Sequence, residues 1–111
     1  MRTDINWIPC PPPLNNAAAK SISATSGAAV GIPAADLAFM AGSKNEYLAK
    51  VKVTAYPAAW QEDGTTATGA DANTTPVGGI FYLESLYAMK KFSAIGVGGT
   101  AVLAITYYQA I

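Results

Sequence analysis

The best β-hairpin candidate in the chain is residues 92–109, which read FSAIGVGGTAVLAITYYQ. Gly98 and Gly99 lie between two apolar runs, and paired glycines accept the positive φ that a tight hairpin turn requires. Along the return strand, both alternating sets of side chains are largely apolar. A strand that is apolar on both faces lies between two layers or at a contact between subunits. We therefore predict a hairpin whose second strand is covered on both faces.

The clearest single strand is residues 46–56, which read EYLAKVKVTAY. Its odd-numbered positions are aromatic or apolar, whereas Lys50, Lys52 and Thr54 lie among the alternate positions. This period of two is typical of a strand with one face on the core and the other in water. Lysines on a strand also discourage edge-to-edge pairing with other chains.

The other segments carry weaker signals. Residues 21–26 predict a short strand, and residues 33–39 predict one helical turn that begins at their proline. Residues 61–78 are mostly small and polar, which predicts a long surface loop. Residues 79–92 fit either a helix or strands. We expect two strands with a kink near residues 84–86, because aromatic and branched side chains are frequent there.

Residues 1–20 predict an extended arm. Prolines at positions 9, 11, 12 and 13 fix φ and remove backbone donors, so neither a helix nor an inner strand runs through them. The arm also carries apolar side chains that are unfavourable in water. Either the arm folds back over its own core, or it lies on a neighbouring subunit. We favour the neighbour, since four prolines disfavour compact folding back.

Together these segments predict a mainly β protein. A chain of 111 residues has room for one domain. We expect a small antiparallel β-sandwich or barrel-like domain over residues 21–111. The extended, proline-rich N-terminal arm of residues 1–20 precedes it.

The composition points to association with other protein. Charged residues make up 13% of the chain and hydrophobic residues 51%, and seven basic residues balance seven acidic ones. Typical soluble domains carry about 25% charged residues. A weakly charged surface without net charge favours association. We infer that neighbouring subunits cover much of the surface.

The sequence offers little chemistry. Histidine is absent and Cys10 is the one cysteine, so His-based catalysis, an intramolecular disulfide and a Cys-based zinc site are excluded. Glu46 and Glu84 would meet across a sheet, but nothing marks them as a catalytic pair. The lysines form two short pairs, too few for the basic stripe of a nucleic-acid binder. We therefore expect no enzymatic activity, no metal, no cofactor, no small-molecule substrate and no nucleic-acid partner.

The C-terminal segment allows a membrane alternative. Residues 92–111 carry no charge and follow Lys90 and Lys91, which fits a transmembrane helix in length and flank. The clustered glycines favour a hairpin instead, and we expect that the chain does not enter a membrane. The first residues lack the apolar core of a signal peptide, which indicates synthesis in the cytoplasm.

In style, the chain resembles the small decoration (cement) proteins of bacteriophage and related viral heads. The shared features are the proline-bearing N-terminus, Ala/Gly/Thr-rich β segments, low charge, no histidine and the closing strand TAVLAITYY, residues 100–108. The resemblance implies a β-sandwich or barrel-like module, often dimeric or trimeric, that sits over joints between major capsid proteins and stabilises the shell. It also implies a virion location and no catalytic residues.

The expected function is therefore that of a non-enzymatic structural subunit. Its partners would be the major capsid protein or other assembly subunits, including further copies of the chain. The alternatives are another virion or tail component, or a small membrane protein anchored by residues 92–111. Because apolar and aromatic side chains dominate interfaces, the candidate interface residues are Ile5, Trp7, Ile8, Pro11, Pro12 and Leu14 in the arm, and Val102, Ala104, Thr106 and Tyr108 in the last strand.

Overall fold

A computed structural model describes residues 6–12, 14–15, 20–68 and 73–110. Two helices and eight strands are present in these residues. In chain order they are β1 (Trp7–Pro9), β2 (Lys20–Ala24), α1 (Ala34–Ala41), β3 (Tyr47–Thr54), β4 (Ala58–Gln61), β5 (Thr74–Thr75), β6 (Ile80–Leu83), α2 (Leu86–Lys91), β7 (Ser93–Gly96) and β8 (Ala101–Ala110).

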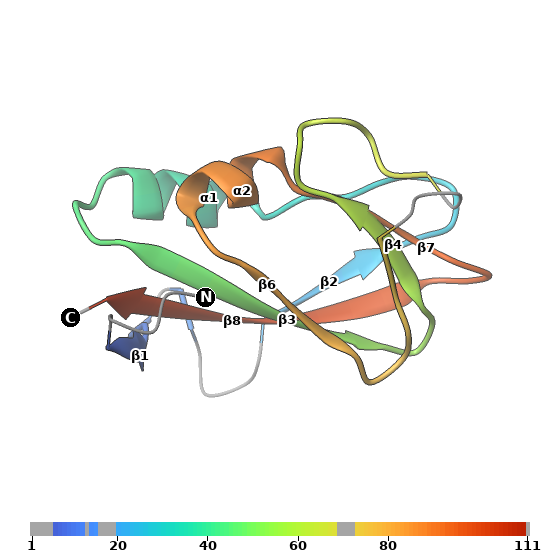
Figure 1. The fold of residues 1–111 in the computed structure, drawn as a ribbon, viewed down its shortest axis with the longest axis horizontal. Helices are drawn as coiled ribbons and strands as arrows, with labels where there is room; N and C mark the ends of the chain where they lie inside the picture. The colour runs from blue at the N-terminus through green and yellow to red at the C-terminus, as the bar shows by residue number, and fades with distance from the viewer. Residues whose placement is uncertain (1–5, 13, 16–19, 69–72, 111) are drawn as a thin grey trace.

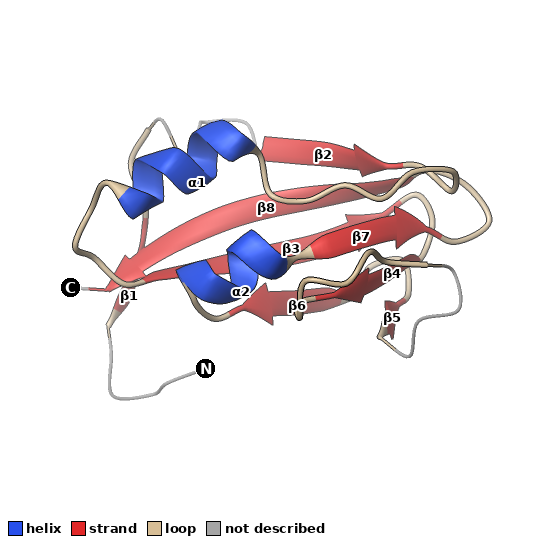
Figure 2. Cartoon of the chain, turned by 90° about the horizontal axis from the view of Figure 1, so that it is seen from above, coloured by secondary structure: helices blue, strands red, loops and turns tan. Residues whose placement is uncertain are grey.

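The strands form two antiparallel sheets. The large sheet has the order β1-β8-β3-β6, and β2 also pairs with β8. The small sheet has the order β5-β4-β7. Figures 1 and 2 show both helices and the small sheet packed over one face of the large sheet. The expected mainly β class and the packing of two antiparallel sheets are therefore confirmed.

The core lies between the two layers. Val51 and Val53 of β3 and Leu103 of β8 are fully buried, as the alternation in the sequence predicted. An aromatic cluster fills the space under the small sheet, where Trp60 stacks on Phe81 with ring centroids 4.2 Å apart. Methionine and leucine side chains of the helices complete the core.

The turn at Gly98 was predicted correctly, but the hairpin was not. β7 pairs with β4 of the small sheet, whereas β8 pairs with β1, β2 and β3 of the large one. The connection therefore passes from one layer to the other. Gly98 has a φ of 81°, and a Cβ on Gly96 would lie 2.0 Å from the carbonyl oxygen of Gly99. These glycines serve a tight passage between layers.

The second strand expected within residues 79–92 is a helix. β6 ends at Leu83, and the Ser85 side chain then accepts a hydrogen bond from the Ala88 N–H, which caps the start of α2. Lys90 and Lys91 lie in the last turn, where the helix dipole favours positive charge. The cap and the terminal lysines were visible in the sequence, but six residues are too few to show a helical period.

Three further expectations can be compared with the structure. The short strand is confirmed as β2, and the helical turn that starts after Pro33 is confirmed and extends to two turns as α1. The loop predicted over residues 61–78 is interrupted, because β5 pairs with β4.

The described part of the arm lies along the large sheet of its own domain. β1 pairs with the end of β8, and Cys10 donates its backbone N–H to the carbonyl oxygen of Tyr107 at 2.9 Å. β1 occupies the edge of the sheet, where a proline such as Pro9 is tolerated because its missing N–H costs no inner ladder bond. The placement of the arm on a neighbouring subunit in an assembly stays a prediction.

The side chain of Asn15 fills the gap between β1 and β2 along the edge of β8. Its Nδ2 donates to the Tyr107 carbonyl oxygen at 2.7 Å, and its Oδ1 accepts from the Tyr107 N–H at 2.9 Å. The amide group therefore pairs with Tyr107 as a strand residue would. Without it, the backbone N–H of a fully buried residue would lose its partner.

Replacing Asn15 tests this contact. We expect Asn15→Ala to lower the free energy of unfolding by about 1–2 kcal/mol, because the Tyr107 N–H loses its acceptor. Asn45→Ala is the control. Asn45 is exposed, and its Nδ2 lies 3.4 Å from the Oε1 of Gln109, which is on β8 like Tyr107. Chemical denaturation should show a change below about 0.5 kcal/mol for the control. Equal losses in both variants would contradict the role given to Asn15.

Candidate functional site

The titratable groups inside the fold are structural. Asp36 is 6% exposed; its Oδ1 lies 2.5 Å from the Lys20 Nζ and its Oδ2 accepts a hydrogen bond from the Tyr107 hydroxyl at 2.8 Å. Burial and the Asp36 contact raise the pKa of Tyr107 well above its usual range. The cluster ties α1 to β2 and β8, and each polar group in it is paired.

Cys10 is a buried thiol. Burial raises its pKa to about 11, so it is a neutral thiol at physiological pH and a poor nucleophile. In the residues that the structure describes, no three His, Cys, Asp or Glu side chains are grouped as a metal site would require. At the surface, Asp63 accepts two hydrogen bonds from Thr65, which lower the pKa of Asp63 and form a local turn.

The most distinctive surface is the face of the large sheet that points away from the helices (Figure 1). Every second side chain of each strand points to this face, and the register of strand pairing brings these side chains side by side. We call this surface the outer face. Its members on β1, β3, β6 and β8 include Trp7, Leu48, Lys50, Lys52, Ile80, Tyr82, Val102, Ala104, Thr106 and Tyr108, and the same register adds the polar Ser21, Ser23 and Thr54.

The outer face is rich in apolar and aromatic side chains. Ile80 is 46% exposed and Tyr82 is 40% exposed. Leu48 is 2% exposed although it points to this side of the sheet. Trp7 and Tyr108 are half-buried beside it. Lys50 and Lys52 lie between these apolar groups, so the face combines an apolar surface with two positive charges.

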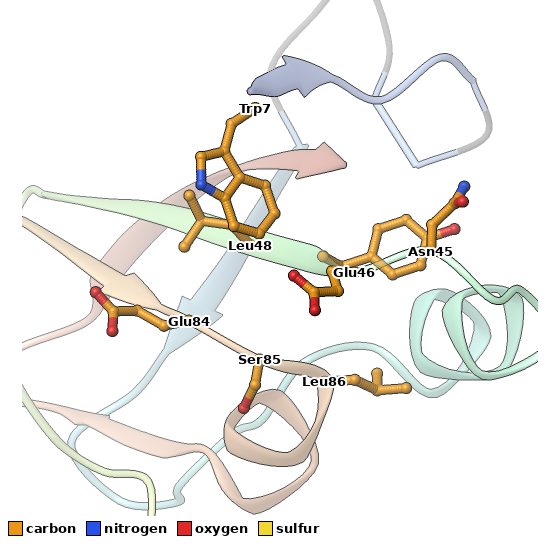
Figure 3. A pocket seen from close by; sticks show the side chains of 8 residues that line it. Trp7, Asn45, Glu46, Leu48, Glu84, Ser85 and Leu86 are labelled. Atoms are coloured by element: carbon orange, nitrogen blue, oxygen red, sulfur yellow. The ribbon is translucent and has the colours of Figure 1, made fainter. Parts of the chain in front are cut away.

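Two hollows meet on this side of the molecule. One has a volume of about 160 Å³ and is lined by Trp7, Leu48, Lys50, Tyr82 and Tyr108. The other has a volume of about 400 Å³ and shares Trp7 and Leu48 with the first. Figure 3 shows Trp7 beside Leu48. The N-terminal arm therefore contributes a side chain to both hollows.

The larger hollow brings together the two carboxylates noted in the sequence. Glu46 precedes β3 and Glu84 follows β6, and both line it (Figure 3). The one hydroxyl group beside Glu84 in this lining, that of Ser85, caps α2. Tyr47 also lines this hollow. The hollow therefore has a rim with two carboxylates beside apolar and aromatic side chains.

The structure gathers half of the predicted interface residues on one surface. Trp7 of the arm and all four residues of the last strand, Val102, Ala104, Thr106 and Tyr108, belong to the outer face. These residues are half-buried. The cover predicted for both faces of β8 is therefore complete on the inner face and partial on the outer face.

The remaining predicted interface residues lie elsewhere. Ile8 is exposed at the edge of the sheet, and Pro11 and Pro12 are exposed in the following turn. Leu14 is 1% exposed and belongs to the core, so in this structure it is not available at the surface. Its apolar side chain is explained by packing within the domain. Ile5 lies outside the described residues.

Sequence reasoning missed the contribution of β6. Ile80 and Tyr82 are exposed, and they alternate with the buried Phe81 and Leu83. The period of two in IFYL is the signal that indicates one exposed face on this strand. The contribution of Lys50 depends on the pairing of β3 with β6 and β8, which no local pattern shows.

Comparison with protein-family models, curated proteins and solved structures finds no match. Of the helices in the described residues, neither has the length and apolar character needed to cross a membrane. Residues 92–111, which would form the anchor of a small membrane protein as a helix, contain β7 and β8 instead. The helical anchor is therefore wrong, because the glycines and the β-branched residues form two strands.

The raised pKa of Cys10 predicts a pH dependence of stability. The folded chain holds the thiol proton more tightly than the unfolded chain, whose pKa is near the ordinary value of 9.0. The contribution is complete below pH 9 and is lost as the pH rises to about 11. We expect the free energy of unfolding to fall across this window.

Cys10→Ala separates this effect from that of Tyr107. In the variant the fall should begin only near pH 10, the ordinary pKa of tyrosine. Urea unfolding at pH 8, 9, 10 and 11 measures both curves. Identical slopes between pH 9 and 10 in the variant and the unmodified chain would refute the assignment.

Proposed function

We propose that this chain is a non-enzymatic structural subunit of a larger assembly and that the outer face is the surface that its neighbours cover. One observation carries the proposal: an aromatic and apolar sheet face, with Trp7, Tyr82 and Tyr108 around Leu48, lies opposite the layer that covers the core. Large exposed apolar patches on soluble proteins mark interaction sites.

The residue types on this face support a protein partner. Tryptophan and tyrosine contribute strongly to interface energies because they bury large areas with little loss of side-chain entropy. Lys50 and Lys52 stand among them, which favours a partner surface with acidic groups. The low charge of the whole chain also favours binding to another protein, because little surface charge has to be desolvated on assembly.

The mechanism of such a subunit is linkage. A protein that binds the assembled state more tightly than the free components stabilises that state by the difference in binding free energy. Many identical copies raise the total without requiring a strong single contact. In its finer form the proposal is a decoration protein on a viral capsid, with the major capsid protein and further copies of the chain as neighbours; another virion or tail component would use the same surface.

Thr106→Asp tests the role of the outer face. Thr106 pairs with Lys50 across the strands, so the new carboxylate gains an ion-pair partner and the fold should tolerate it. It also places a negative charge in the middle of the face, where we expect it to weaken docking about tenfold or more. The matched control is Tyr87→Asp, because Tyr87 is 71% exposed on α2, away from the face.

The measurement is sedimentation of the tagged chain after co-expression with the genes that flank it in its genome. The unmodified chain and Tyr87→Asp should sediment with large particles, and Thr106→Asp should stay with small species. Thermal unfolding of the purified variants verifies their folding. An unmodified chain that never joins large particles would contradict the proposed function, and equal recovery of Thr106→Asp would remove the outer face from it.

A further inference from the structure

β6 forms an open edge of the large sheet. It pairs with β3 on one side, and in the part of the chain that the structure describes no strand pairs with its other side. The opposite edge is formed by β1 and β2, which follow one another along β8 with the Asn15 side chain between them. That edge carries Pro9 in β1 and Lys20 in β2.

The backbone groups of two residues point out of this edge. Val53 exchanges backbone hydrogen bonds with Gly78 and Gly79, which fixes it as a position that bonds toward β6. Bonding positions alternate along an antiparallel strand, so Phe81 and Leu83 bond to β3. Ile80 and Tyr82 consequently direct their N–H and C=O groups away from β3.

Apart from its short length, β6 carries none of the residue types that discourage strand pairing. Natural edge strands are very short, carry lysine or proline, or lie under a loop or helix. β6 reads IFYL and contains neither residue type. Lys50 and Lys52 lie one strand further in, on β3. The exposed side chains at the edge, Ile80 and Tyr82, are apolar or aromatic.

A second copy of β6 complements this edge. In an antiparallel pair centred on Phe81, Ile80 of each copy lies opposite Tyr82 of the other, and both residues have outward backbone groups. Each such pair exchanges two N–H···O=C bonds. The side chains then form cross-strand pairs of a β-branched and an aromatic residue, which are favourable in sheets.

The charges also favour this edge over the outer face for contacts between copies. Edge pairing separates β3 from its copy by three strand spacings, about 14 Å. That distance exceeds the Debye length of about 8 Å at physiological salt, so the lysines on β3 repel each other little. Stacking two outer faces would instead place Lys50 and Lys52 of both copies against one another.

We propose that two copies join by antiparallel pairing of β6 with β6, about a two-fold axis at Phe81, so that the large sheet continues across the dimer. The inference rests on the proposed function, of which it names one partner. Both outer faces lie on the same side of the joined sheet and act as one docking surface. A contact of four residues per copy is small, so dimerisation in dilute solution is weak, with a Kd of about 10 μM or above.

Ile80→Pro tests the pairing at a single backbone group. Proline removes the outward N–H of residue 80 and leaves the bonds of Phe81 and Leu83 to β3 intact. Ile80→Ala is the matched control, since it removes the same side chain and keeps the N–H. In sedimentation equilibrium, we expect Ile80→Pro to dimerise at least tenfold more weakly than Ile80→Ala, and Thr106→Asp to dimerise like the unmodified chain.

A disulfide test covers the case in which Ile80→Pro does not fold. A mixture of Ile80→Cys chains and Tyr82→Cys chains, each with Cys10→Ala, should form crosslinked heterodimers faster than either chain forms homodimers. Equal dimerisation of the proline and alanine variants, loss of the dimer in Thr106→Asp, or no preference for the heterodimer would overturn the proposal.

The two proposals fail in different ways. A chain that is monomeric at millimolar concentration but still sediments with large particles would overturn the β6 pairing alone. A chain that dimerises through β6 but joins no particle would overturn the proposed function alone.

Discussion

The structure depends on β8, which bonds along both of its edges and packs with one face on the core. On one side of β8, β3 pairs with residues 102–109. On the other side, β1, the Asn15 side chain and β2 follow one another along the strand. A buried strand must find partners for all of its backbone groups, because an unpaired buried N–H or C=O is costly. In the structure, the N-terminal arm supplies β1 and the Asn15 amide as partners for the C-terminal half of β8.

Sequence reasoning succeeded where the signal is local. Alternation identified β3 and its buried face from a single stretch of eleven residues, and Pro33 marked the start of α1. It failed where the partner lies far away in the chain. β7 pairs with β4, more than thirty residues earlier, and no property of residues 92–109 distinguishes that arrangement from a local hairpin. The outer face was half predicted for the same reason, since Tyr82 joins Tyr108 only through the order of the strands.

The arm's apolar residues acquire different roles once the fold is known. Leu14 fills the core, and Trp7 extends the outer face from the edge of β8. Deletion of residues 1–20 would therefore remove β1, Leu14 and the Asn15 amide together. Such a truncation changes folding and docking at once, so single substitutions on the outer face are the informative experiments.

An arm that packs in cis remains compatible with assembly, because it builds part of the surface that would be covered. Leu48 is almost fully buried on the side of the sheet that carries no second layer, and Trp7 and Tyr108 line the same hollow. The domain thus hides the Leu48 side chain with its own aromatic residues. Ile80 stays exposed together with aromatic rings and lysine side chains, which tolerate water and also bind well to protein. Under the proposed function, a surface of this kind would let a chain without net charge exist as a free subunit before assembly.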